Sequence, residues 1–124
     1  MATIEIKSEG DLLILSVTGN LTAEEIEAVI QGHYQKTSVK DVIWDLTNGS
    51  ILTISNSSFK DLAKAVKDSL VSGARKGGKT AYVGSVDVEY GILHMCVAFA
   101  DMVKVPISYN VFRTIEKARS WISS

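Results

Sequence analysis

Short runs of strand-forming residues alternate with longer stretches of helical periodicity, and this alternation limits the fold more than any other feature of the sequence. Apolar and polar side chains alternate over Thr3–Lys7, which is typical of a half-buried strand. A second strand-like run, Leu12–Val17, follows the turn-forming residues Ser8–Asp11. Because this connection is so short, we expect the two strands to form an antiparallel hairpin.

Helix-sized segments separate the later strand-like runs, which predicts parallel pairing between them. These runs are Val39–Leu46, Thr80–Val83 and Ile107–Phe112. Apolar residues at helical spacing predict helices over Ala23–Lys36, Phe59–Leu70, Val88–Val103 and from Thr114 onward. The order β-β-α-β-α-β-α-β-α indicates one α/β domain over residues 1–124, with a mostly parallel sheet, an antiparallel edge strand and helices packed on it.

Residues that favour helix starts accompany all four helices, and Thr114 is expected to cap the last one. Thr22 and Glu25 have the spacing of a capping box, in which each side chain satisfies a free amide of the other residue. Ser58 and Asp61 are expected to form a second cap pair, and Asp87 is expected to cap the third helix.

Composition narrows the class of protein. A formal net charge of −1 gives no overall field that would favour nucleic acid, and 46% apolar residues fit a packed globular domain. The strongly apolar segment Tyr90–Ala100 is shorter than the ~20 residues of a membrane span. A single cysteine, Cys96, and a start that leads straight into a strand predict a cytoplasmic protein.

The best candidate for a functional site is the carboxyl end of the strand over Val39–Leu46, where a polar loop is expected to follow. The side chains that mark it are Asp45, Thr47, Asn48 and Ser55. Asp45 has three interpretations, namely a brace for the loop, a Mg²⁺ ligand, or the base of a small enzyme. Because no second acid, metal cluster or activated nucleophile accompanies it, we predict no catalytic residue, metal or cofactor.

One motif match is rejected on its context. Gly73–Thr80 fits the phosphate-binding pattern G-x-x-x-x-G-K-[ST], which requires a strand before the loop and a helix after it. Here a helix precedes the segment and a strand follows it. We therefore interpret Gly73 as a helix C-cap and expect Lys79 to enter the strand.

The predicted third helix is apolar around most of its circumference. His94 and Cys96 are two residues apart on it, so their side chains point to different faces, and both are expected to be packing residues. Met95, Phe99 and Met102 lie on the same helix. Three interpretations remain open for them, namely core, a dimer interface, or the lining of a pocket for an apolar ligand.

The stretch Val42–Leu62, VIWDLTNGSILTISNSSFKDL, resembles a region of STAS domains, the anti-sigma factor antagonist fold. In that region a strand ending in Asp-Leu-Ser leads to a serine-bearing loop and a helix. The closing Val111–Arg113, with Ala118 and Trp121, resembles the uncharacterised STAS-like branch that is grouped by fold with lipid-transfer domains of CRAL-TRIO type.

The resemblance implies a non-enzymatic regulatory or ligand-binding module that acts through protein contacts, with a homodimer as one form. Typical antagonists carry their phosphorylated serine in Asp-Ser-Ser-Gly, where this chain has Asn56-Ser57-Ser58-Phe59. Ser57 and Ser58 are therefore candidate phospho-acceptors in a changed motif, and helix caps in the alternative interpretation. The alternative function is a carrier or sensor of an apolar or lipid-like molecule, held between the third helix and the sheet.

Overall fold

The computed structural model describes residues 2–34, 39–70, 75 and 77–124. Its strands and helices follow the predicted order, with a short π-helical segment, η1, added after α1. The bounds are β1 Thr3–Glu9, β2 Leu12–Asn20, α1 Ala23–Val29, η1 Ile30–Tyr34, β3 Asp41–Ser50, α2 Asn56–Ser69, β4 Lys79–Val83, α3 Asp87–Met102, β5 Ser108–Phe112 and α4 Ile115–Ser123.

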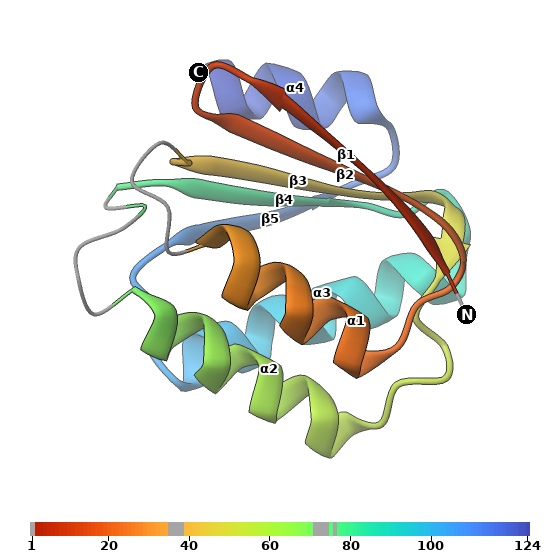
Figure 1. Cartoon of the computed structure of the whole chain (residues 1–124). Helices are drawn as coiled ribbons and strands as arrows, with labels where there is room; N and C mark the ends of the chain where they lie inside the picture. The colour runs from red at the N-terminus through yellow and green to blue at the C-terminus, as the bar shows by residue number, and fades with distance from the viewer. Residues whose placement is uncertain (1, 35–38, 71–74, 76) are drawn as a thin grey trace.

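The five strands form one sheet in the order β1-β2-β3-β4-β5. β1 pairs with β2 antiparallel, and β2 through β5 pair parallel, which confirms the predicted hairpin and the predicted parallel pairing. Figure 1 shows the sheet nearly edge-on, with α1, α2 and α3 on one face and α4 on the other. The fold is therefore a single mixed α/β sheet with an antiparallel edge.

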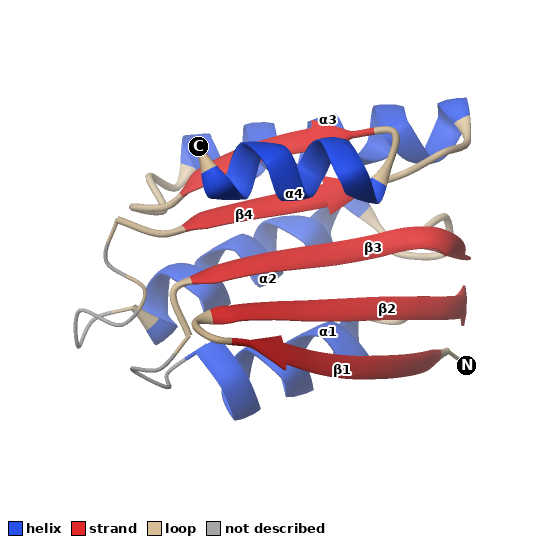
Figure 2. Cartoon of the chain, turned by 90° about the horizontal axis from the view of Figure 1, so that it is seen from above, coloured by secondary structure: helices blue, strands red, loops and turns tan. Residues whose placement is uncertain are grey.

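Side chains alternate between the two faces of the sheet along each strand. Val42, Trp44 and Leu46 of β3 enter the larger core under α1, α2 and α3, whereas Ile43 enters the smaller core under α4. In Figure 2, α4 lies in front of the sheet near β4, and the other three helices lie behind it. β3 is central and buried on both faces, which explains its nearly continuous apolar start.

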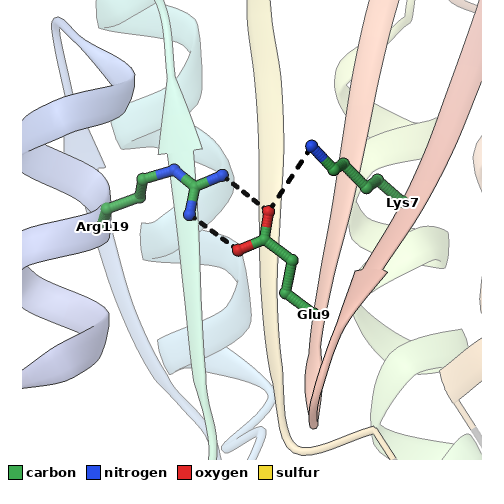
Figure 3. Close-up of polar contacts among 3 residues, drawn as sticks. All are labelled: Lys7, Glu9 and Arg119. Carbon is green, nitrogen blue, oxygen red and sulfur yellow. Dashed lines mark hydrogen bonds and ion pairs between the residues drawn. The ribbon is translucent and has the colours of Figure 1, made fainter.

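An ion pair ties the edge hairpin to α4 (Figure 3). Arg119 donates two hydrogen bonds to the Glu9 carboxylate, at 2.9 and 3.0 Å, and the Lys7 amine lies 3.8 Å from the same carboxylate. Hydrogen bonding from Arg119 lowers the pKa of Glu9 below its ordinary value. The pair connects residues 110 positions apart in sequence, so it fixes α4 relative to β1.

The glycine-rich basic segment falls largely outside the described residues, because residues 71–74 and 76 are not described. The predicted C-cap at Gly73 is among them. Lys79 begins β4 as predicted, and its amine donates to the backbone oxygen of Trp121 at 2.9 Å. The described part of the segment thus leads into a strand and not into a phosphate-binding helix.

Candidate contact site at the carboxyl end of the sheet

β3 extends further than predicted, which moves Thr47 and Asn48 from the expected loop into the strand. The strand continues to Ser50, so Asp45, Thr47 and Asn48 lie within it. A register shift lies between Ser16 and Thr18 of β2, beyond which Thr18 pairs with Asn48. The polar sequence looked like a loop, but its backbone keeps pairing with β2 beyond this irregularity.

Asp45 braces this irregularity. One of its carboxylate oxygens, Oδ1, accepts from the Thr47 backbone N–H at 3.0 Å and from the Thr47 hydroxyl at 2.5 Å. The bulged backbone loses its regular strand partner, and the carboxylate satisfies the amide instead. This geometry matches the interpretation of Asp45 as a structural brace.

α2 begins three residues earlier than predicted. Ser55 is its N-cap, and the Ser55 side chain accepts from the Ser58 backbone N–H at 3.2 Å. The predicted pairing of Ser58 with Asp61 as a cap is therefore wrong, because both residues already lie inside the helix. Ser57 is exposed in the first turn. Ser58 is half-buried and lines a hollow between α1 and α2.

Three acidic residues line the same hollow as Ser58. They are Glu24 and Glu27 of α1 and Asp61 of α2. The Ser58 hydroxyl also accepts from the Ser55 hydroxyl at 2.9 Å. The two candidate serines therefore have different electrostatic surroundings, even though they are adjacent in sequence.

The N-cap of α3 is not Asp87, the residue that the sequence predicted. Val86 is the N-cap and makes no side-chain cap bond, and Asp87 is the first helical residue. Asp87 instead pairs with Arg113 at 2.6 Å, and the Arg113 guanidinium lies over the Tyr90 ring at 4.0 Å. These contacts join the start of α3 to the segment that follows β5.

Glu89, in the first turn of α3, is buried with 4% of its surface exposed. Its Oε2 accepts from the Ile51 backbone N–H at 3.2 Å, across 38 residues of sequence. The sequence patterns did not single out this residue. Its signal was a glutamate at the third position of a helix whose cap, Val86, offers no side-chain oxygen.

Three exposed apolar side chains lie on the two segments that this bond joins. Leu52 follows Ile51 in the β3–α2 connection and is 51% exposed, and Val86 and Val88 at the start of α3 are 56% and 53% exposed. The connections after β3 and β4 are neighbours because these two strands pair in parallel. We call Leu52, Val86 and Val88 the contact rim.

An apolar cavity lies beneath the rim, between the three helices and the sheet, with a volume of about 60 Å³. From α3 its lining comprises Leu93, Cys96 and Ala100. Met95, Phe99 and Met102, for which core, interface and pocket were all open, do not line this cavity. Met95 and Phe99 are partly buried against the larger core, and Met102 is 69% exposed. Helical periodicity explains the difference, since residues spaced three and four apart share a face.

The other candidate residues on α3, Cys96 and His94, show little evidence of a catalytic role. Burial raises the pKa of the Cys96 thiol to about 12, which leaves it protonated and unreactive near neutral pH. His94 is exposed, with its ring edge-on to Tyr90 at 4.7 Å between ring centres, so it is not a core residue, and its alternative role at an interface stays a prediction. Within the described part of the chain, no cluster of His, Cys, Asp and Glu side chains could hold a metal ion.

None of the helices in the described ranges combines the length and apolar character needed to cross a membrane.

Comparison with known proteins gives matches of structure only. No family model matches the chain, and no curated protein matches it either. A crystal structure of an anti-sigma factor antagonist from Mycobacterium paratuberculosis matches with a TM-score of 0.69 and 14% identity, over 100% of this chain and 96% of that one.

Two further structures agree. The anti-sigma factor antagonist SpoIIAA in its unphosphorylated form matches with a TM-score of 0.59 and 15% identity, over 98% of this chain and 99% of that one. An uncharacterised DUF3478-family protein with a SpoIIAA-like fold from Shewanella loihica matches with a TM-score of 0.55 and 18% identity, over 98% and 93%. At these identities the likeness establishes the fold, and the chain has the STAS-like fold of anti-sigma factor antagonists.

Proposed function

We propose that this chain is a non-enzymatic, cytoplasmic regulatory module that binds another protein through the contact rim. The observation that carries the proposal is the grouping of Leu52, Val86 and Val88, each more than half exposed, at one end of the sheet. Scattered single apolar residues are ordinary on a protein surface, whereas a group at one edge is typical of interaction sites.

The surroundings of the rim suit a protein interface. Tyr90 and Arg113 lie beside it, and these residue types are enriched among the residues that contribute most to binding. Arg113 is held in place by Asp87 at 2.6 Å. A partner would therefore meet an apolar rim flanked by an arginine that is already oriented.

The cavity supports the carrier alternative less well. Its volume is about 60 Å³, whereas an engineered cavity that binds benzene measures about 150 Å³. An acyl chain would require α1, α2 or α3 to move away from the sheet. The enzyme alternative is also weaker, because Asp45 uses Oδ1 to brace Thr47 in the strand, which is a structural role.

Regulation by phosphorylation is part of the proposal, and of the two candidates we assign it to Ser57. Ser57 is exposed at the start of α2, where helix amides and the dipole favour a phosphate. A phosphate on Ser58 would enter the hollow lined by Glu24, Glu27 and Asp61, where like charges repel it. A phosphorylation map of protein from its own cells tests this, and modification of Ser58 alone contradicts it.

Site-specific photo-cross-linking in the cells of origin tests the protein-contact proposal. A photoreactive amino acid replaces Leu52, Val88 or, as a matched control, Met102, which is also apolar and more than half exposed but lies at the other end of α3. We expect Leu52 and Val88 to capture the same protein and Met102 not to capture it.

The products discriminate between the remaining alternatives. A captured mass equal to this chain identifies a homodimer, and a different mass identifies another protein. Equal capture at all three positions, or none at the rim, contradicts the proposal. Native mass spectrometry of the purified protein provides an independent check, since a copurifying apolar molecule would favour the carrier function.

A further inference from the structure

The carboxylate of Glu89 is buried, and the proposed function does not explain why a glutamate occupies this position. Glutamate is almost never fully buried unless it is paired, yet Glu89 is 4% exposed. The hydrogen bond described for its side chain goes to the Ile51 backbone N–H. A buried amide without a partner is costly, so this bond stabilises the backbone at the point where β3 ends.

The remaining hydrogen bonds of the β3–α2 connection are local. The Leu52 N–H donates to the Ser50 hydroxyl at 3.2 Å, and the Ile54 N–H donates to the Ile51 backbone oxygen at 3.2 Å. Ser55 caps α2 through Ser58. These bonds shape the connection internally, but they do not place it relative to α3.

Ile51 is held from two sides. Its side chain is 2% exposed and lines the cavity among residues of α2 and α3. Its N–H is bound by Glu89. With Ile51 fixed inward, the next side chain, Leu52, is left exposed.

We infer that Glu89 is the positioning residue of the contact rim, because it fixes the connection bearing Leu52 against the helix start bearing Val86 and Val88. Both halves of the rim come from segments far apart in sequence, and the bond from Glu89 to Ile51 joins those segments directly. The role of Glu89 in fixing these two segments against each other does not depend on the proposed function. Its consequence for partner binding rests on the proposed function.

The segment between β4 and α3 packs closely against α3, which supports a fixed position for the start of that helix. A Cβ atom on Gly84 would lie 2.8 Å from Cδ1 of Leu93 and 3.6 Å from Cβ of Glu89. The segment before α3 therefore passes tightly against the helix turn that carries Glu89. Glu89 also sits in the first turn, where a negative charge is favoured by the helix dipole.

Hydrogen exchange of single amides, measured by NMR on the full chain without any partner, tests the structural part. Glu89→Leu keeps bulk and removes the acceptor, whereas Glu89→Gln keeps an acceptor oxygen. We expect the Ile51 amide to exchange at least about tenfold faster in Glu89→Leu, beyond any change in the slowest core amides, and within about threefold of wild type in Glu89→Gln. Glu25→Leu, at the equivalent position of α1, is the matched control and should leave Ile51 unchanged.

Three results overturn the inference. One is an Ile51 amide in the wild-type protein that exchanges as fast as exposed Thr53, a measurement that requires no variant to fold. The second is equal acceleration in Glu89→Leu and Glu25→Leu. The third is loss of protection in Glu89→Gln as large as in Glu89→Leu. Because no partner is present, these outcomes are independent of the cross-linking result that tests the proposed function.

Discussion

The starts of α1 and α3 carry a glutamate at the same helical position, and the two carboxylates bind different partners. In α1, the Glu25 carboxylate accepts from the Thr22 N–H at 3.0 Å, and the Thr22 hydroxyl accepts from the Glu25 N–H at 3.2 Å. In α3 the cap is Val86, and Glu89 accepts from Ile51. The Glu25 carboxylate thus completes the cap of its own helix and also accepts from the Ala2 backbone, whereas Glu89, whose helix cap has no side-chain oxygen, accepts from Ile51.

The surroundings of the two glutamates, Glu25 and Glu89, also differ. At Glu25, burial raises the carboxylate pKa, but hydrogen bonds from the Thr22 backbone and hydroxyl outweigh it, so the pKa lies below its ordinary value. Glu25 is partly exposed, whereas Glu89 is buried. The comparison teaches that a glutamate at this helical position completes the cap in α1, whereas in α3 it takes no part in a cap and joins the helix to the end of β3.

Removing the packing of α3 should give the largest effect. Leu93 is 1% exposed and lies one turn after Glu89 on the same helix face. Leu93→Ala should lower the free energy of unfolding by roughly 2–5 kcal/mol, because it enlarges the existing cavity. Urea denaturation measures this, and a loss below about 1 kcal/mol would show that α3 is not held by this face.

Removing the acceptor at Glu89 should come second. Glu89→Leu leaves the buried Ile51 N–H without a partner, which should cost about 1–3 kcal/mol of unfolding free energy. Glu89→Gln should cost clearly less. If urea denaturation gives the two variants the same stability, the acceptor oxygen of Glu89 is not the stabilising feature. The contrast with Glu25 would then be wrong.

Removing the cap of α1 should have a smaller and local effect. Thr22→Ala deprives the Glu25 N–H of its acceptor and should cost about 1 kcal/mol. Amide exchange should change within the first turn of α1 and remain the same at Ile51. A change at Ile51 would mean that the two helix starts are coupled, contrary to the comparison.

The surface pair between Glu9 and Arg119 should give the smallest effect and a defined pH dependence. Since the pKa of Glu9 is lowered in the fold, its contribution is present above the unfolded-state pKa and is lost as pH falls through the folded-state pKa. Arg119→Gln should therefore be less stable than wild type near neutral pH, and the difference should shrink in acid. A thermal-unfolding difference that grows on acidification would contradict this sign.

The sequence predicted the features that depend on local patterns. Helical spacing and the Thr22–Glu25 capping box are decided within a few residues, and the structure confirms them. The alternation over Thr3–Lys7 predicted the strand correctly, but Ile6 within it is 43% exposed and not buried. The helix start at Ser55 was placed wrongly because several serines in a row offer equivalent caps, and only the backbone geometry selects one.

Features that depend on distant segments could not be read from the sequence. The polar residues Thr47–Ser50 remain in β3 because β2 continues beside them. Glu89 could not be linked to Ile51 because the bond joins residues 38 positions apart. Met102, the last residue of α3, is 69% exposed, which its apolar character did not indicate.

The affinity of the captured partner for matched surface variants tests the central claim most directly. Leu52→Asp places a charge in the contact rim, and Met102→Asp places the same charge at the other exposed end of α3. With purified partner and calorimetric titration, we predict that Leu52→Asp weakens binding at least about tenfold and that Met102→Asp leaves it within about twofold. Equal affinities for the two variants, or a greater loss with Met102→Asp, would contradict the assignment of binding to the contact rim.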